Sequence, residues 1–254
     1  MPSREEIKRA VRESYGDMAE KRSTSLVVLS CCEPTGEPKL EKLLRYGYSS
    51  AELEWIPESV KVMSDGCGNP TGLGMIKEGD TVLDLGSGGG IDVLLASRKV
   101  GPKGKVIGLD MTPEMVRAAT GNAKKLKLGN VEFKLGEIER IPLDDSSIDV
   151  VMSNCVICLS PDKKAVFREM FRVMRAGGRL AIADEIATKR FTEAERADPD
   201  KWCSCITGAI TEEEYRRALR EADFEQVYVK QLRPSASEAP SVFSAFISAI
   251  KPMN

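Results

Sequence analysis

Residues 82–90 read Val-Leu-Asp-Leu-Gly-Ser-Gly-Gly-Gly, a short apolar run that leads directly into a glycine-rich turn. The run from Thr81 to Leu85 has the length and composition of a buried strand, and the segment Ile91–Lys99 after the turn has a helical pattern. Glycines in such a turn let a ligand approach the backbone, and the first turn of the helix offers free N–H groups. The turn alone is a weak signal, because a tight strand-to-helix connection also needs glycine.

Segments with strand patterns alternate with helical segments from Asp80 onward. Two helix starts are clear, a capping box from Ser3 to Glu6 and a capping Thr112 followed by Pro113. Further strands are expected at Lys105–Asp110, Val131–Leu135, Ile148–Ser153 and Arg179–Ala183, and helices at Pro113–Leu126 and Pro161–Arg175, the latter ended by residues 176–178 (Ala-Gly-Gly). A helix capped by Thr211 and closing strands at 225–230 and 242–249 complete the pattern. It predicts an α/β sheet with an irregular segment before it and an insertion around residues 187–210.

Composition excludes several classes of protein. The 254 residues are 42% hydrophobic, enough to bury a full core, and the formal net charge is −2 without any basic block, so no nucleic-acid partner is expected. No apolar run approaches the roughly 18 residues that a membrane helix needs. The first residues lack the apolar core of a signal peptide. We therefore expect a soluble cytoplasmic protein, acting as a monomer.

Histidine and cysteine counts are more informative. The chain has no histidine, which excludes histidine-based acid–base catalysis and Ser-His-Asp triads. It has seven cysteines: Cys31, Cys32, Cys67, Cys155, Cys158, Cys203 and Cys205. In a cytosolic protein such a set indicates soft-ion binding or redox chemistry more often than structural disulfides. The alternative is that most of them are small buried hydrophobic residues.

Three details of the glycine turn define its ligand. The pattern is Gly-x-Gly-x-Gly and position 91 is Ile, so the dinucleotide pattern Gly-x-Gly-x-x-Gly is not met. Asp84 precedes the turn, where a carboxylate repels a pyrophosphate but can bind an ammonium group. Asp110 ends the next strand, where a carboxylate can hold both hydroxyls of a ribose; the alternative is that it caps the following helix. A ligand with a ribose, an amine and no phosphate fits, and S-adenosylmethionine is such a ligand.

This set of motifs, over residues 80 to about 185, resembles the class I methyltransferase superfamily, which implies a Rossmann-like, doubly wound sheet. The resemblance places S-adenosylmethionine on Asp84, the turn residues Gly86, Ser87, Gly88 and Gly90, and Asp110. Met111 would pack on the adenine, and the Ile138 N–H with the Glu139 carboxylate, or alternatively Glu137, would bind its edge. The fourth strand, which ends at Ser153-Asn154, would lie beside the reactive methyl group.

The cysteines indicate the methyl acceptor. Cys155 directly follows the fourth strand, Cys67 lies in a glycine-rich turn before the cofactor strand, and Cys205 lies in the insertion. Thiolates near an electrophilic methyl group suit a soft, three-coordinate centre with a lone pair, by the rule that pairs soft ligands with soft ions.

Three blocks resemble those of the arsenite methyltransferases: residues 66–70 (Gly-Cys-Gly-Asn-Pro), residues 153–163 from Ser153-Asn154-Cys155 to Lys163, and residues 205–210 from Cys205 to Ile210. Residues 46–49 (Tyr-Gly-Tyr-Ser) match as well. This resemblance implies methyl transfer to As(III) bound by Cys67, Cys155 and Cys205, with arsenite, methylarsenite or their thiol conjugates as substrates. Residues 1–72 would form an N-terminal annex, 73–185 the cofactor-binding core, and 186–254 the arsenic-binding insertion and the closing strands.

The same resemblance implies a disulfide relay. Cys31 or Cys32 would pair with Cys67 during turnover, and thioredoxin or a small thiol such as glutathione would reduce that disulfide. Position 158 departs from the family pattern, since it is Cys where the family more often has Asn. The vicinal pair leaves open which N-terminal cysteine acts.

Three other interpretations compete. An ordinary small-molecule methyltransferase would carry incidental cysteines, and a metalloid-sequestering protein would leave the cofactor motifs unexplained. A structural zinc site could use Cys155 and Cys158 with Cys203 and Cys205, although a Cys-x-Cys pair is an uncommon zinc spacing.

Overall fold

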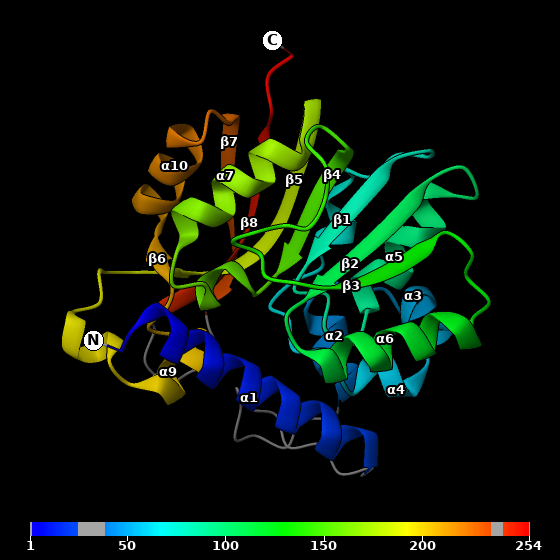
Figure 1. Cartoon of the computed structure of the whole chain (residues 1–254), viewed down its shortest axis with the longest axis horizontal. Coiled ribbons are helices and arrows are strands. Elements are labelled where there is room, and N and C mark those ends of the chain that lie inside the picture. The colour runs from blue at the N-terminus through cyan, green and yellow to red at the C-terminus, as the bar shows by residue number, and fades with distance from the viewer. Residues whose placement is uncertain (1, 25–38, 235–240, 254) are drawn as a thin grey trace.

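The computed structural model describes residues 2–24, 39–234 and 241–253, which form one α/β unit (Figure 1). The helices are α1 (Arg4–Thr24), α2 (Lys39–Arg45), α3 (Ser50–Trp55), α4 (Glu58–Lys61), η1 (Pro70–Leu73), α5 (Ile91–Val100), α6 (Pro113–Lys125), η2 (Ile157–Leu159), α7 (Lys163–Val173), α8 (Glu193–Arg196), α9 (Pro199–Cys203) and α10 (Glu212–Glu221). The strands are β1 (Thr81–Leu85), β2 (Lys105–Asp110), β3 (Val131–Leu135), β4 (Ile148–Asn154), β5 (Met174–Ala187), β6 (Ile210–Thr211), β7 (Glu225–Pro234) and β8 (Val242–Ile250).

The strands form a single sheet in the order β3-β2-β1-β4-β5-β8-β7, with the short β6 paired to β5. The first five are parallel, whereas β8 is antiparallel to both β5 and β7. The chain order reverses between β1 and β4, which is the position where open α/β sheets bind their ligands. The predicted doubly wound sheet with two closing strands is confirmed.

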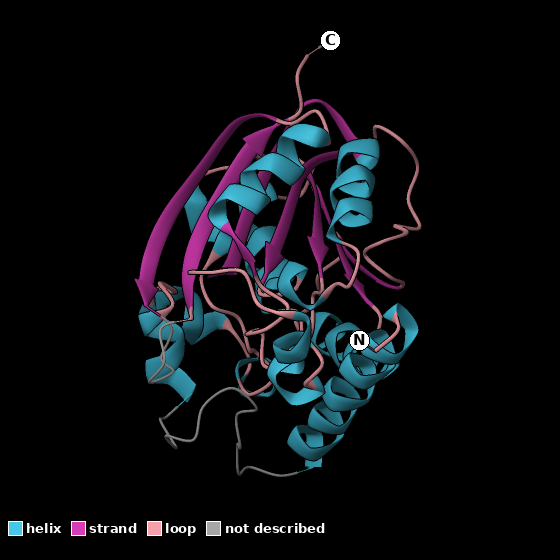
Figure 2. Cartoon of the chain, turned by 90° about the vertical axis from the view of Figure 1, so that its left-hand side faces the viewer, coloured by secondary structure: helices cyan, strands magenta, loops and turns pink. Residues whose placement is uncertain are grey.

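Helices cover both faces of the sheet, and Figure 2 shows a further group of helices beyond the ends of the strands. Side chains alternate between the faces along each strand. Leu83 and Leu85 of β1 therefore pack in the cluster that includes α7 and α10, whereas Val82 packs in the cluster that includes α5. Among the described residues, no helix has the length and apolar character needed to span a membrane.

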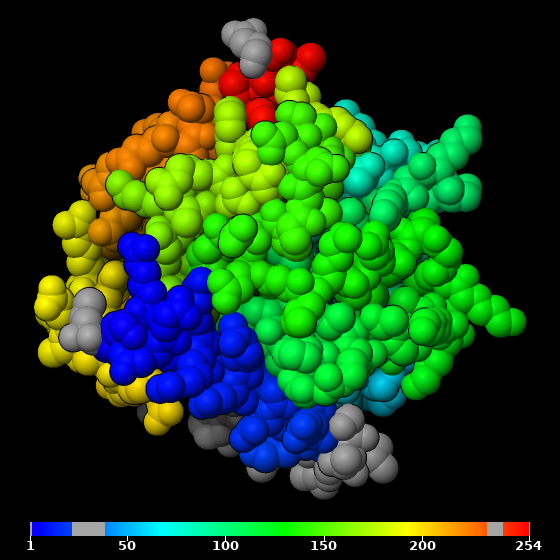
Figure 3. Space-filling model, viewed as in Figure 1, coloured from blue at the N-terminus to red at the C-terminus, as the bar shows by residue number. Residues whose placement is uncertain are grey.

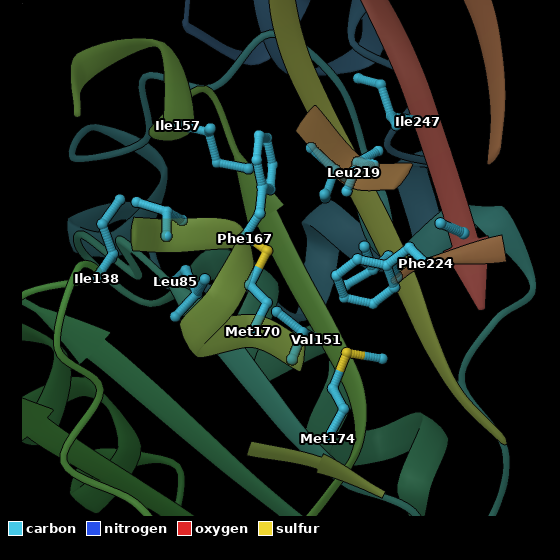
Figure 4. Packing of buried hydrophobic residues seen from close by; sticks show 14 of the residues in the cluster. Leu85, Ile138, Val151, Ile157, Phe167, Met170, Met174, Leu219, Phe224 and Ile247 are labelled. Atoms are coloured by element: carbon cyan, nitrogen blue, oxygen red, sulfur yellow. The ribbon is translucent and has the colours of Figure 1, made fainter. Parts of the chain in front are cut away.

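The largest apolar cluster lies under α7 and α10 (Figure 4). Phe167 and Met170 of α7 and Leu219 of α10 are completely buried against the sheet. Phe167 also meets Tyr215 of α10, with ring centroids 5.2 Å apart and planes tilted by 60°. This packing fixes the β4–α7 connection, which carries two cysteines of the site.

Helix α1 lies across the carboxyl-terminal side of the sheet, where it packs against α6 and α9. In the space-filling view of Figure 3 it is the blue segment between the green centre of the molecule and the yellow insertion. The predicted capping box is confirmed, since the Glu6 carboxylate accepts the Ser3 N–H at 2.6 Å and the Ser3 hydroxyl accepts the Glu6 N–H at 3.2 Å.

Three local expectations were wrong. The segment before the sheet is not irregular, because it forms α2, α3, α4 and η1 between residues 39 and 73. Thr112 stands at the start of α6 but its side chain makes no capping hydrogen bond. The helix expected to run to Arg175 ends earlier, because α7 ends at Val173 and β5 begins at Met174. The Ala-Gly-Gly stretch therefore lies within β5, where Gly177 has a φ of 73°.

Candidate active site

The carboxyl ends of β1, β2 and β4 open into a cavity that α1 closes from the other side. Nine of the ten residues predicted to bind the cofactor line it: Asp84, Gly86, Ser87, Gly88, Asp110, Met111, Ile138, Glu139 and Asn154. Gly90 does not. It is the residue before α5, with a φ of 93°, and a Cβ there would lie 3.0 Å from the Phe133 ring. Only glycine accepts this conformation readily.

Asp110 organises the glycine turn. One carboxylate oxygen accepts the Gly88 N–H and the other accepts the Thr112 N–H, both at 2.9 Å. Asp110 thus binds the N–H of the residue that precedes α6, in addition to an N–H of the glycine turn. Each carboxylate oxygen has a second lone pair, so both can still accept a hydrogen bond from a ligand.

A buried hydroxyl in the same turn lacks a partner. Among the described residues, nothing hydrogen-bonds the Ser87 Oγ atom, although it is buried in the cavity wall. A buried polar group without a partner costs free energy. A polar ligand that hydrogen-bonds this hydroxyl would remove that cost, and Ser87 belongs to the cavity wall.

Three buried carboxyl groups give the cavity its electrostatic character. Burial raises the pKa of Asp84, with Asp92 and Asp110 adding repulsion, and burial also raises the pKa of Asp92, to about 6. Because carboxylates crowded together repel one another, a cationic ligand stabilises their charged forms. Asp92 was not among the predicted site residues, although the sequence places it in the first turn of the helix after the glycine turn.

Asn154, the last residue of β4, connects four elements of the site. Its Nδ2 donates to the Gly68 carbonyl at 2.8 Å and to Asp92 at 3.0 Å, and lies 3.1 Å from the Tyr48 hydroxyl. Its Oδ1 accepts the Cys67 N–H at 3.0 Å. Tyr48 in turn donates to Asp92 at 2.9 Å. This network holds the Cys67 turn against the end of β4.

The two glutamates considered for the adenine edge have partners on other elements. Glu139 accepts the Ser160 hydroxyl at 2.5 Å and lies 3.4 Å from the Lys8 ammonium group of α1. Glu137 binds Lys8 at 2.8 Å and Arg12 at 3.2 Å. Through these ion pairs the two glutamates tie α1 to the segment after β3. Of the two, Glu139 lines the cavity and Glu137 does not.

Four buried thiols meet at the end of β4. The sulfur of Cys155 contacts those of Cys67, Cys158 and Cys205. The sulfurs of Cys155, Cys158 and Cys205 all lie within 4.8 Å of one another, and Cys67 and Cys155 form a second such group with a Glu185 oxygen. None of the five cysteines that the structure describes is part of a disulfide.

The backbone at this cluster is unusual. Cys155 and Cys205 have φ angles of 59° and 61°, in the left-handed region that few residues other than glycine occupy. Such strain persists where the surroundings enforce it, often at functional sites. Cys155 also lines the cavity, which puts the thiol cluster in contact with the space for the cofactor.

The thiols differ in acidity. Contact with Cys155, followed by contact with Cys158, lowers the pKa of Cys205. The Cys155 contact is likewise the largest single influence on Cys67 and favours its thiolate, but burial, the nearby Glu185 and Asp184 carboxyl groups and Cys158 together outweigh it and raise the pKa of Cys67 to about 12. Cys205 is therefore the thiol that ionises most readily, and thiolates are the forms that bind soft ions.

Of the other three cysteines, the structure describes only Cys203. Cys203 is half-buried and belongs to neither sulfur group. The zinc site considered from the sequence therefore lacks one of its four ligands. Cys31 and Cys32 lie outside the described residues.

Comparisons with known proteins agree with this architecture. Residues 76–223 match the methyltransferase domain family. The arsenite methyltransferase of Halobacterium salinarum is 40% identical over 237 residues, covering 89% of this chain and 59% of the relative. The human arsenite methyltransferase is 35% identical over 216 residues, covering 81% of this chain and 54% of the relative.

A solved structure is similar over much of its length. The arsenic(III) S-adenosylmethionine methyltransferase of Chlamydomonas reinhardtii has 35% sequence identity and a TM-score of 0.68, covering 80% of this chain and 72% of that one. The chain spans somewhat more than half the length of the curated relatives it matches. The shared domain, the shared sheet and these relatives show that the chain belongs to the methyltransferase-domain family and, within it, to the arsenite methyltransferases.

Proposed function

We propose that this protein transfers the methyl group of S-adenosylmethionine to As(III) held by Cys67, Cys155 and Cys205. The observation that carries the proposal is the cluster of buried thiols in contact with the cavity wall at Cys155. Soft thiolate ligands select soft ions over hard ones. A methyl acceptor bound there lies next to the cofactor space without any need for a histidine base.

The cofactor is assigned to the cavity by the chemistry of its walls. Asp110 would accept the ribose hydroxyls with its free lone pairs, and Asp84 would bind the ammonium group. Gly86 and Gly88 leave room for the ligand, and Ser87 would gain the partner that its hydroxyl lacks. Met111, Ile138 and Glu139 would surround the adenine, with Asn154 at the methionine end.

The reaction follows from the proposed placement of the two substrates. The arsenic lone pair attacks the methyl carbon in line with the carbon–sulfur bond, a new arsenic–carbon bond forms, and the bonding electrons leave with the sulfur as S-adenosylhomocysteine. Thiolate donation would raise the electron density on arsenic, and the site would hold the reacting atoms close together. Arsenic is oxidised from As(III) to As(V), so two electrons must return before the next cycle.

Protein thiols would supply those electrons. Cys67 and either Cys31 or Cys32 would form a disulfide as the arsenic is reduced, and thioredoxin or glutathione would then reduce the disulfide by thiol exchange. The free thiols of the described chain suit the reducing conditions of the cytoplasm. We expect the enzyme to work there as a monomer.

Single Cys→Ser variants test the ligand set. Monomethylated As(III) as substrate avoids the first methylation step, so loss of turnover reports on arsenic binding. Cys155→Ser and Cys205→Ser should abolish its methylation, because a hydroxyl cannot replace a thiolate on arsenic. The matched control Cys203→Ser, from the same insertion, should retain most activity, since packing changes of this kind usually cost under about 2 kcal/mol. Full activity of Cys155→Ser would overturn the assignment.

A further inference from the structure

We infer that Cys155, Cys158 and Cys205 form a second three-thiolate site for As(III), in which Cys158 stands in for Cys67. The inference rests on the proposed arsenic chemistry of the cluster and adds a ligand to it. Family resemblance gave Cys158 no role, because that position more often holds Asn.

The three sulfurs are close enough to share one ion. They lie within 4.8 Å of one another, and Cys155, Cys158 and Cys205 are 7%, 0% and 3% exposed. Three thiolates around one soft ion, each at about 2.3 Å, lie at most about 4.0 Å apart when the site is planar, and closer together when it is pyramidal. Closure of the site therefore brings the sulfurs together by roughly an ångström, which rotation of the side chains can supply.

The insertion is fixed over Cys158 by direct contacts. The Trp202 indole donates to the Leu159 carbonyl at 2.9 Å, and the Cys205 N–H donates to the Trp202 carbonyl at 3.0 Å. A Cβ on Gly208 would lie only 2.2 Å from the Cys158 carbonyl oxygen. The Cys205 thiol also contacts the Cys155 carbonyl at 3.6 Å. The structure thus holds these thiols together through η2 and the insertion, independently of the Cys67 turn.

Charge favours a trivalent ion in this position. Three thiolates and As(III) are neutral together, whereas three thiolates and a divalent ion such as zinc carry one negative charge. The Asp184 carboxyl group contacts Cys158, and a Glu185 oxygen lies within 4.8 Å of the Cys155 sulfur. The Lys163 ammonium group, which donates to the Cys158 carbonyl at 3.2 Å, offsets only one of these two negative charges. Since an uncompensated buried charge is costly, the neutral arsenic complex is preferred here.

The second site has a place in the catalytic cycle. When Cys67 is part of a disulfide after a methyl transfer, a newly arriving arsenite finds only Cys155 and Cys205 of the first site, and inorganic As(III) has three bonds to satisfy. Once the methylated product has left, Cys158 completes the set, so arsenite can be bound before the disulfide is reduced.

Sulfur coordination of bound arsenic tests the inference directly. The protein would be reduced and then freed of the added thiol reductant. One equivalent of arsenite would be added without S-adenosylmethionine, and the sulfur neighbours of arsenic would be counted by X-ray absorption. Cys67→Ser should show three sulfurs, and Cys67→Ser/Cys158→Asn only two, with at least tenfold weaker binding. Cys67→Ser/Cys203→Ser is the matched control and should keep three. Should the Asn variant misfold, as judged by circular dichroism, Cys67→Ser/Cys158→Ala replaces it with a small apolar side chain.

Several results would overturn the inference. Two sulfurs in Cys67→Ser alone would show that Cys158 is no ligand, as would unchanged coordination and affinity after its replacement. Stoichiometric zinc in the purified protein, lost when Cys158 is replaced, would show that the three thiols form a zinc site and not an arsenic site. None of these measurements involves methyl transfer, so failure of this inference can be told apart from failure of the proposed function. If the wild type methylates arsenite but Cys67→Ser shows only two sulfurs, the second site alone is contradicted.

Discussion

Removal of the Asn154 amide should loosen the Cys67 turn from the end of β4. The side chain donates to the Gly68 carbonyl and to Asp92, and accepts the N–H groups of Cys67 and Gly68 at 3.0 and 3.3 Å. Each net hydrogen bond contributes about 0.5–1.5 kcal/mol. Four bonds, less the relaxation of nearby groups toward water, give a loss of about 3 kcal/mol in unfolding free energy for Asn154→Ala.

A control asparagine separates this effect from general destabilisation. Asn130 donates to the Ser97 and Gly101 carbonyls, both at 3.0 Å. None of these three residues lines the cavity. Asn130→Ala should cost about 1–2 kcal/mol from two lost bonds. Its affinity for As(III) should equal that of the wild type, because neither Asn130 nor its partners Ser97 and Gly101 belong to the cavity wall or to the sulfur groups.

Urea unfolding gives the stability of each variant, and calorimetry at 20 °C gives its affinity for As(III). We expect Asn154→Ala to bind As(III) at least tenfold more weakly than the wild type while it is still folded. The reasoning is refuted if Asn154→Ala keeps wild-type arsenic affinity, or if its stability loss does not exceed that of Asn130→Ala.

Other variants test the cofactor cavity and the relay. Asp110→Ala should lower S-adenosylmethionine affinity tenfold to 100-fold in calorimetry, because a charge-assisted contact of about 1.5–3 kcal/mol is lost. As(III) binding should survive, and unchanged cofactor affinity would exclude the ribose contact. Asp92 has its pKa raised to about 6, chiefly by burial, so its negative charge is lost as pH falls through that value. Affinity for the cationic cofactor should therefore decline between pH 7.5 and 5.5, and Asp92→Asn should flatten this dependence; equal slopes would disprove the link. Replacing both Cys31 and Cys32 by Ser should spare methylation of monomethylated As(III) but stop or slow that of arsenite, and equal loss on both substrates in product analysis would refute the relay.

The sheet was predictable because its signals are local. The first three strands begin and end at the predicted residues, since β1 and β2 are short, largely apolar runs, β3 alternates apolar and charged residues, and each has a glycine or an aspartate at its end. The helices α2, α3 and α4 are only 4 to 7 residues long, too short to show a helical period. Their formation depends on tertiary packing instead, as the buried Leu43, Leu53 and Val60 indicate.

The site was predictable only in part, for a related reason. Cysteines and aspartates at strand ends are readable from sequence, because parallel strands bring their carboxyl ends to one edge. The contact of Tyr48 with Asp92 and that of Asn154 with Gly68 span 44 and 86 residues, and no local pattern encodes them. Whether Cys158 points toward or away from Cys155 depends on the turn at η2, which only the packing of the insertion fixes.

Transfer of an isotopically labelled methyl group to arsenic is the most direct test of the central claim. Purified, reduced protein would be incubated with S-adenosylmethionine carrying a ¹³C-methyl group, arsenite and glutathione, and the arsenic species separated and identified by mass spectrometry. We predict ¹³C-methylated arsenic in equal amount to S-adenosylhomocysteine, summed over methyl groups, and none with Cys155→Ser. Protein that binds S-adenosylmethionine but yields no methylated arsenic under these conditions would contradict the proposed function.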